Sequence, residues 1–201
     1  MIAIVDYGMG NLRSVTNAFL RLGGNVVITR KKNVIKESNA IVLPGVGAFG
    51  KCIENLKKFD IFDLLKELIM NDRRYLGICL GMQVLFESSE EAPGVQGMCV
   101  IKGDVPRFRG DMKVPHMGWN SIDTQGRRVP VLRGINNGDF LYFVHSYYCK
   151  PGEDVTATKT TYGIDFASSV QRGNLFACQF HPEKSQRVGL QLVRNFINIC
   201  E

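Results

Sequence analysis

The sequence predicts an α/β fold with a mostly parallel central sheet, helices on both faces of that sheet, and antiparallel additions in the C-terminal half. Apolar, strand-like runs alternate with segments of helical periodicity in the first half, which is typical of parallel β-α units. The second half holds short strand-like runs separated by turn signals. A chain of 201 residues, 45% hydrophobic and 22% charged, suits one compact unit, so we expect residues 1–201 to form a single domain.

The first half supplies the expected parallel strands and their helices. Apolar runs predict strands at residues 1–5, 26–28, 40–43 and 75–78. Helical spacing of apolar residues predicts helices at 12–22, 50–58 and 61–70, and a further helix that begins at Leu80. Four β-α units in succession therefore build the parallel sheet.

The second half predicts antiparallel strands and one closing helix. Strand-like runs lie at residues 98–102, 114–117, 140–144, 155–160, 166–171 and 175–180, with Pro-Gly and Asn-Gly turn signals between them. Apolar residues at helical spacing predict a last helix at 188–200.

Composition and motifs exclude several classes of protein. No run of about 18 apolar residues predicts a membrane helix, and no signal sequence follows Met1, so we expect a cytoplasmic protein without membrane contact. The net charge is +6, but the basic pairs are scattered and no nucleic-acid motif accompanies them. Gly8-x-Gly10-x-x-Arg13 lacks the third glycine of a dinucleotide fingerprint, and no acidic residue closes the second strand. We expect no nucleic-acid partner and no nucleotide cofactor.

The six cysteines indicate neither a metal site nor a disulfide framework. They are scattered along the chain and none forms a C-x-x-C pair. In a reducing compartment we expect thiols, and we expect neither a metal nor any other cofactor.

Cys79 lies in a pattern that suits a nucleophile. Gly77-x-Cys79-x-Gly81 joins a predicted strand to a predicted helix, as in a nucleophile elbow, the sharp turn that presents a reactive side chain. Glycines avoid collisions at such a turn, and the helix N-terminus favours a thiolate. The Leu80 N–H is placed to hold an oxyanion. A buried core cysteine is the alternative, since isolated cysteines pack like small hydrophobic residues.

A proton shuttle and its orienting group are predicted at His181 and Glu183. His181 precedes Pro182, which favours extended backbone, and residues two apart in extended backbone face the same way. The Glu183 carboxylate can then bind one imidazole nitrogen and leave the other for Cys79. Cys178 is expected to face away and pack. A loop histidine without a catalytic role is the alternative.

A glycine-rich loop ends the third predicted strand. Pro44-Gly45-Val46-Gly47 lies at the carboxyl end of that strand, where ligands bind in open parallel sheets. Backbone N–H groups in such a loop can face an anion. An ordinary strand-to-helix turn explains the same residues, because glycine and proline are the commonest turn residues.

These motifs resemble the class I glutamine amidotransferase family, whose members carry a Cys-His-Glu triad. Residues 77–83 and 181–183 carry the main resemblance. The segments 44–49, 115–120 and 142–148 narrow it to glutaminase subunits of imidazole glycerol phosphate synthases, which serve histidine biosynthesis. The resemblance spans nearly the whole chain. It implies a flavodoxin-like fold, hydrolysis of glutamine to glutamate and ammonia, and a (β/α)₈ cyclase subunit as heterodimeric partner that receives the ammonia.

The resemblance also assigns roles to single residues. Cys79 matches the nucleophile, His181 the acid and base, and Glu183 its orienting carboxylate. The second oxyanion donor would come from Val46 and Gly47. The residues matched to glutamine binding are Gly45, Gln83, Glu87, Ser146 and Tyr147. The residues matched to the partner interface are Asn11, Trp119, Tyr142 and Lys184.

Three other functions stay open at this point. A paralogous glutaminase that aminates a nucleotide sugar for surface polysaccharide would carry the same motifs. A cysteine hydrolase of related fold would also use a cysteine elbow, but no glutamate just after the first strand matches that group. A non-catalytic binding subunit would be expected to have lost Cys79 or His181.

Overall fold

The computed structural model describes residues 1–200, which form three β-sheets and the helices packed around them. The strands are β1 (Ile2–Val5), β2 (Val26–Thr29), β3 (Ala40–Gly45), β4 (Arg74–Cys79), β5 (Ser88–Ser89), β6 (Gly103–Val105), β7 (His116–Ser121), β8 (Phe140–His145), β9 (Lys150–Pro151), β10 (Thr156–Tyr162), β11 (Ile164–Arg172) and β12 (Leu175–Cys178). The helices are α1 (Leu12–Arg21), α2 (Lys32–Glu37), α3 (Phe49–Lys58), α4 (Phe62–Met70), α5 (Leu80–Gln83) and α6 (Gln186–Cys200), with 3-10 turns η1 (Pro130–Leu132) and η2 (Pro182–Lys184).

The main sheet has seven strands in the order β10-β11-β12-β4-β3-β1-β2. The five strands from β12 to β2 pair in parallel, and β11 and β10 continue the sheet antiparallel at one edge. This arrangement confirms the predicted fold class. The carboxyl ends of β3 and β4, the two central strands, lie side by side, because Gly45 pairs with Cys79 in their register.

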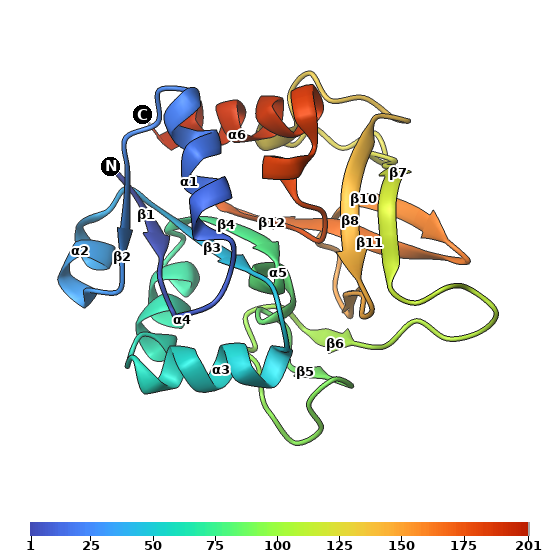
Figure 1. The fold of residues 1–201 in the computed structure, drawn as a ribbon, viewed down its shortest axis with the longest axis horizontal. Coiled ribbons are helices and arrows are strands. Elements are labelled where there is room, and N and C mark those ends of the chain that lie inside the picture. Colours follow the sequence, from blue (N-terminus) through green and yellow to red (C-terminus); the bar gives the residue numbers. More distant parts are fainter. Residues whose placement is uncertain (201) are drawn as a thin grey trace.

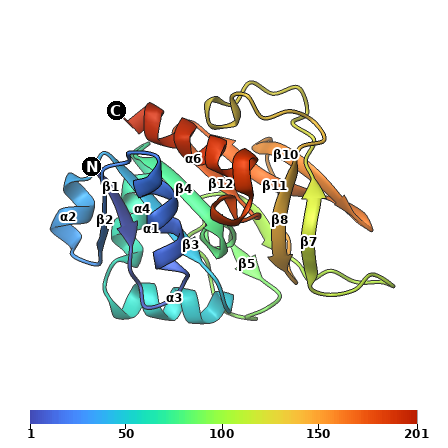
Figure 2. The same cartoon turned by 45° about the horizontal axis from the view of Figure 1, so that its top comes forward.

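Helices cover both faces of this sheet, with α1 and α6 on one side and α3 and α4 on the other (Figures 1 and 2). β1 shows the pattern that this arrangement needs. Ile2 and Ile4 pack in the apolar cluster under α1 and α6, whereas Ala3 and Val5 pack in the cluster under α3 and α4. All four are at most 3% exposed, so the strand is apolar on both faces, as a central parallel strand must be.

The C-terminal half differs from the prediction in how its strands assemble. Only β10 and β11 extend the main sheet in antiparallel fashion, while β7 and β8 pair with each other as a separate two-stranded ribbon beside it (Figure 2). We call β7 and β8 the β7–β8 ribbon. β5, β6 and β9 form a third, small sheet.

Two predicted strands were wrong or misplaced. Residues 98–102 are irregular, because the N–H groups of Met98 and Val100 bond to the carbonyls of Val84 and Leu85 and not to a strand. Their apolar side chains fill the core, which explains the strand-like pattern. The strand predicted at 114–117 lies instead at β7, and it begins after the turn at Pro115.

The helices agree with the sequence more closely, with two exceptions. α1, α3, α4 and α6 begin and end within two residues of their predicted limits. α2 was not predicted, because Ile35 is its single buried residue and provides no periodic stripe. α5 is a single turn, Leu80–Gln83. The apolar pattern continues to Phe86 because residues 84–86 are fully buried, although they lie outside the helix. Among residues 1–200, no helix has the length and apolar character needed to cross a bilayer.

Candidate active site

Cys79 lies on a strained turn between β4 and α5. Its φ of 54° and ψ of −105° are rare for a residue with a side chain. The two flanking glycines are required by close backbone contacts. A Cβ on Gly81 would lie 1.9 Å from the Leu43 carbonyl oxygen, and one on Gly77 would lie 2.5 Å from the Gly81 oxygen. The backbone therefore has the shape predicted for a nucleophile elbow, with Cys79 at the N-terminus of α5.

The predicted contact between His181 and Glu183 is also present. His181 Nδ1 lies 2.9 Å from Glu183 Oε1, and both side chains are 2% exposed. The reason differs from the prediction, since only His181 is extended and Glu183 belongs to the η2 turn. His181 Nε2 and Glu183 Oε2 are buried and make no hydrogen bond of ordinary geometry within residues 1–200, but the Cys79 thiol lies close enough to interact with the ring. Unpartnered buried polar atoms are uncommon, and a catalytic role is one explanation for them.

The electrostatics favour a charged imidazole at His181. Burial lowers the pKa of this ring, but its interactions with Cys79 and then Glu183 outweigh burial and raise the pKa to about 10. The imidazolium is therefore the form held between the Cys79 thiol and the Glu183 carboxylate at neutral pH. Such a pair favours the thiolate, which is the nucleophilic form of cysteine.

The β7–β8 ribbon fixes the position of His181. The His181 N–H donates to the Tyr142 carbonyl oxygen at 2.9 Å, and the Tyr142 N–H donates to Ser185 Oγ at 2.9 Å. Ser185 Oγ closes the loop by donating to the His181 carbonyl oxygen at 2.6 Å. Two of these hydrogen bonds thus attach the residues around the η2 turn to β8, far away in sequence, and the third closes the turn on itself.

A cavity of about 380 Å³ opens beside Cys79. Its lining residues come from the elbow, the loop after β3, the end of β8 and two further loops: Val46, Gly47, Cys79, Leu80, Gln83, Glu91, Pro115, Val144, His145, Ser146 and Tyr147. The predicted oxyanion residues Leu80, Val46 and Gly47 are among them, as are the predicted substrate residues Gln83, Ser146 and Tyr147. Gly45 pairs with Cys79 across β3 and β4 and is buried below this lining.

Besides Gly45, the structure places one further predicted substrate residue, Glu87, outside the cavity lining. Glu87 is exposed, and its Oε2 accepts a hydrogen bond from the Gly103 N–H at 2.8 Å, which joins two loops. Glu91 occupies the cavity wall instead, with Oε2 accepting from the Phe49 N–H at the start of α3 at 2.7 Å. Glu87 therefore does not line this cavity, whereas Glu91 does.

Sequence reasoning missed Glu91, His145 and Gln179. Glu91 follows Glu90 in a polar turn, and nothing local distinguishes the two glutamates. His145 lines the cavity, and the Gln179 Nε2 lies 3.4 Å from the Cys79 sulfur. Gln179 stands two residues before His181, and this proximity is the one signal that could have identified it.

Three of the four predicted interface residues form one surface group. The Trp119 and Tyr142 rings, paired across the β7–β8 ribbon, meet edge to face at 6.0 Å, and Lys184 Nζ lies 5.7 Å from the Tyr142 ring centre. Trp119 is 46% exposed, as predicted, but it lies on a strand and not in a loop. Asn11 caps the N-terminus of α1, where its Oδ1 accepts from the Ser14 N–H.

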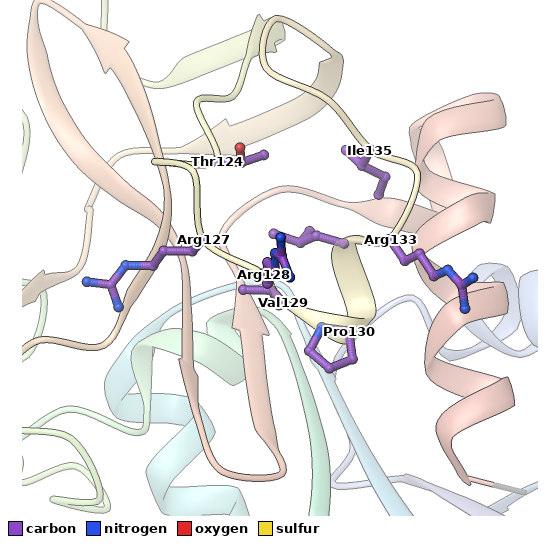
Figure 3. A pocket seen from close by; sticks show the side chains of 8 residues that line it. Thr124, Arg127, Arg128, Val129, Pro130, Arg133 and Ile135 are labelled. Atoms are coloured by element: carbon purple, nitrogen blue, oxygen red, sulfur yellow. The ribbon is translucent and has the colours of Figure 1, made fainter.

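A second hollow of about 360 Å³ lies on the surface around η1. Val129, Leu132 and Ile135 contribute apolar side chains to it, and the Arg127 and Arg133 side chains extend away from it in opposite directions (Figure 3). None of the described residues that line it is an acid, a histidine or a cysteine. The cavity beside Cys79 contains the elbow cysteine and is therefore the candidate active site.

This site and fold match one class of enzyme. The profile of the family described as glutamine amidotransferase class-I matches residues 3–200. The chain therefore belongs to the class-I glutamine amidotransferase family. A solved glutamine amidotransferase structure has the same fold, with a TM-score of 0.78 and 20% identity over 100% of this chain and 99% of that chain.

Closer relatives define the branch of this family. The chain is 48% identical to the imidazole glycerol phosphate synthase subunit HisH of Geobacter metallireducens, over 97% of this chain and 96% of that protein. It is 46% identical to the HisH subunit of Methanocaldococcus jannaschii, over 99% of this chain and 100% of that protein. Within the class, the chain belongs with the HisH subunits of imidazole glycerol phosphate synthase, as its motifs had indicated.

Proposed function

We propose that this chain is the glutaminase subunit of imidazole glycerol phosphate synthase and that it hydrolyses glutamine to glutamate and ammonia at Cys79. The observation that carries this proposal is the Cys79 thiol on the wall of a cavity, together with its interaction with His181, whose other ring nitrogen lies 2.9 Å from Glu183. The full-length similarity to HisH subunits supports the synthase and the histidine pathway over the nucleotide-sugar route. The match over residues 3–200 supports one functional domain.

The first half-reaction forms a covalent intermediate. The Cys79 thiolate attacks the side-chain carbonyl carbon of glutamine, and an S–C bond forms. The Leu80 N–H, at the start of α5, holds the oxyanion together with a second donor from the Val46–Gly47 peptide. Each such donor is typically worth about 3–4 kcal/mol of the barrier. The His181 imidazolium then gives its proton to the amide nitrogen as the C–N bond breaks, and ammonia leaves.

The second half-reaction releases glutamate. Neutral His181 takes a proton from water, whose oxygen attacks the γ-glutamyl thioester carbon. The C–S bond breaks, and the products are glutamate, a thiolate on Cys79 and an imidazolium on His181. Glu183 holds Nδ1 throughout, which keeps Nε2 directed to the reacting atoms.

The cavity supplies groups for both ends of glutamine. Gln83 and the backbone of Ser146 and Tyr147 line it and can bind the substrate amide and α-carboxylate. The Glu91 carboxylate is the acidic group on the wall, so we assign it to the α-ammonium group of glutamine in place of Glu87. Gly45 lets β3 approach the elbow, because a Cβ there would lie 2.7 Å from the Leu80 Cβ.

The partner of this chain is proposed to be the (β/α)₈ cyclase subunit, which receives the ammonia. The relatives are named as subunits of a synthase, which supports a partner subunit. The exposed side of the β7–β8 ribbon offers an apolar face with Met117, Trp119 and Phe140, each 46% exposed or more. Lys184 adjoins this face, and α1, which Asn11 caps, packs against the η2 turn. We expect the cyclase to dock there.

Activity is expected to depend on the partner. Gly47 has a φ of 106°, and the Val46–Gly47 peptide lies in an exposed loop directly after β3. Glycine permits such a peptide to reorient, so docking at the nearby face can complete the oxyanion site. Glutaminase turnover should be much faster with the cyclase and its ligand than with this chain by itself. Equal rates would refute the dependence.

A glutamate assay with the cyclase present tests the function. The Cys79→Ala variant should form no glutamate while it still folds and binds its partner, because the change from thiol to methyl is sterically mild. The Cys178→Ser variant is the matched control. Cys178 is fully buried against the Gly77 and Phe180 carbonyls, and it should keep most activity. Turnover in Cys79→Ala, or equal loss in both variants, would show that the nucleophile assignment is wrong.

A further inference from the structure

Gln179 is a fully buried polar side chain that the mechanism above does not use. It lies between the end of β12 and His181, and it is 0% exposed. Its Nε2 lies 3.4 Å from the Cys79 sulfur, and its Oε1 accepts a hydrogen bond from Gln83 Nε2 at 3.0 Å. Both the nitrogen and the oxygen of this buried amide therefore have polar contacts, and the nitrogen contacts the reactive sulfur. The amide is thus placed to affect the chemistry of that sulfur.

The orientation of this amide follows from a backbone carbonyl. The Tyr147 oxygen can only accept, so the end of Gln83 that lies 3.3 Å from it must be the NH₂ group. The same NH₂ group lies against Gln179, whose facing atom must therefore be its oxygen. The opposite end of Gln179, which faces Cys79, is then the NH₂ group. The fold thus directs an N–H donor, and not a carbonyl oxygen, at the sulfur.

The buried His145 holds the Tyr147 carbonyl oxygen, and the buried His116 in turn holds His145. His145 Nδ1 lies 2.7 Å from the Tyr147 oxygen and must donate to it, which leaves His145 Nε2 to accept from His116 Nδ1 at 2.9 Å. His116 Nε2 then accepts from the Asn120 amide at 3.2 Å. Burial lowers the pKa of His116 to about 4 and that of His145 to about 3, which keeps both rings neutral. Each ring therefore has one fixed tautomer.

We propose that Gln179 is a catalytic residue of the glutaminase: its side-chain N–H donates to Cys79 Sγ and stabilises the thiolate that attacks glutamine. A hydrogen-bond donor favours the charged form of the acceptor that it contacts, and the effect is larger where water is excluded. Gln179 complements His181. Its N–H group donates a hydrogen bond to the sulfur, but it transfers no proton during the reaction and its protonation state does not change. This inference rests on the proposed role of Cys79 as nucleophile.

Few groups beside Gln179 can influence the ionisation of Cys79. The titratable groups that interact with it are Tyr7 after β1, Cys149 after β8, Cys178 on β12 and His181. Burial raises the pKa of Tyr7, Cys149 and Cys178 well above the ordinary values, so these three stay neutral. Of these four groups, His181 is therefore the one that can carry a charge beside Cys79 between pH 5 and 9.

The rate at which iodoacetamide alkylates Cys79, followed as a function of pH on the full chain, tests the proposal without glutamine. Mass spectrometry of the peptide that contains Cys79 isolates its reaction from that of the other cysteines. Gln179→Met keeps the length of the side chain but removes the N–H donor. We expect the midpoint of the pH profile to rise by about one pH unit or more, which means about tenfold slower alkylation below the midpoint.

The matched control is Gln191→Met, which changes a glutamine of α6 whose amide bonds to Asn195 and not to the site. Its midpoint should equal that of the unmodified chain. A merely structural role for Gln179 would change access and hence the plateau rate at high pH, but would leave the midpoint in place. An unchanged midpoint in Gln179→Met contradicts the proposal.

A second variant covers the case in which Gln179→Met does not fold, as judged by circular dichroism. Gln83→Met releases the Gln179 oxygen and so removes the constraint that directs its N–H to sulfur. Its alkylation midpoint should rise too, and an unchanged midpoint would again contradict the proposal. Because alkylation requires no substrate, a chain that alkylates as expected but forms no glutamate would refute the glutaminase function and leave the role of Gln179 standing.

Discussion

Single residues in this chain acquire their chemistry from their surroundings. Cys79 and Cys178 are both buried cysteines near His181, yet only Cys79 lies on a strained turn that opens to a cavity. Cys178 packs against carbonyl oxygens, and burial raises the pKa of its thiol well above the ordinary range. The same thiol group is therefore inert at one position and reactive at the other.

Replacing Glu183 by glutamine should lower the pKa of His181 from its value of about 10. Burial alone would lower the pKa of this ring, so losing the charge on Glu183 removes part of what opposes burial. NMR titration of isotope-labelled histidines measures this directly. His116 and His145 provide internal controls, because both should stay neutral between pH 5.5 and 9. An unchanged titration of His181 in Glu183→Gln would mean that Glu183 does not stabilise the imidazolium.

The same shift has a consequence for stability. The pKa of His181 is raised above the unfolded value of about 6.5. Its contribution to the free energy of unfolding is therefore complete below about pH 6.5 and is lost as the pH rises toward 10. Part of that contribution comes from Cys79 and Glu183 and should disappear with either of them.

At the scale of elements, the elbow depends on the close approach of three backbone segments. Gly81→Ala should lower the free energy of unfolding by about 2 kcal/mol or more, because overpacking a rigid backbone contact costs roughly 1–3 kcal/mol and sometimes more. The Cβ would lie 1.9 Å from the Leu43 oxygen, which cannot move without shifting β3. Urea unfolding measures the effect.

The control is Gly152→Ala, where a Cβ would meet its nearest atom at an ordinary 3.6 Å and where φ is not positive. This variant should unfold within about 1 kcal/mol of the unmodified chain, since a glycine-to-alanine change at a compatible site is worth about 0.4–1 kcal/mol. Equal destabilisation of the two variants would show that the contact at Gly81 is not decisive.

The β7–β8 ribbon should weaken in acid. Burial depresses the pKa values of His116 and His145 below the unfolded value, so the unfolded chain binds protons first as the pH falls from about 6.5 to 4. The free energy of unfolding should decline over that range, in which the contribution of His181 is constant. Urea curves at several pH values measure it. A doubly substituted chain with His116→Gln and His145→Gln should show a shallower decline, and the same slope in both proteins would refute this cause.

Elements set by local sequence patterns could be predicted, whereas elements set by contacts between distant residues could not. The elbow and the extended backbone at His181 are local patterns, because glycine spacing and a following proline dictate backbone shape within a few residues. α2 and the irregular stretch at 98–102 could not be predicted, since tertiary contacts and not periodicity decide them. Glu91 and Gln179 reach the site only through the folded arrangement of α3 and β12. No local pattern encodes a meeting between residues so far apart in the chain.

At the scale of the whole molecule, the active site and the expected docking face share a backbone. Tyr142 contributes its ring to the face beside Trp119, and its carbonyl oxygen holds the His181 N–H. A displacement of β8 would therefore move His181 directly. Tyr142 by itself therefore connects the face on which a partner would dock to the catalytic His181.

Trp119→Ala should weaken binding to the cyclase by more than about 1 kcal/mol if this ring anchors the interface. Trp119 is 46% exposed, so the free chain should keep its melting temperature. A calorimetric titration against the cyclase and a thermal melt of the variant measure the two quantities. A large drop in melting temperature with unchanged affinity would move the docking face elsewhere.

The most direct test of the central claim is labelling of the chain, in complex with the cyclase, by a glutamine analogue that carries an electrophilic diazoketone in place of the side-chain amide. Such a compound binds as glutamine does and alkylates the nucleophile that it meets. We predict that it modifies Cys79, no other cysteine among those described, and that glutamine in excess prevents the reaction. Modification of a different residue, or labelling of Cys79 that glutamine does not slow, would contradict the assignment of this site as a glutaminase centre.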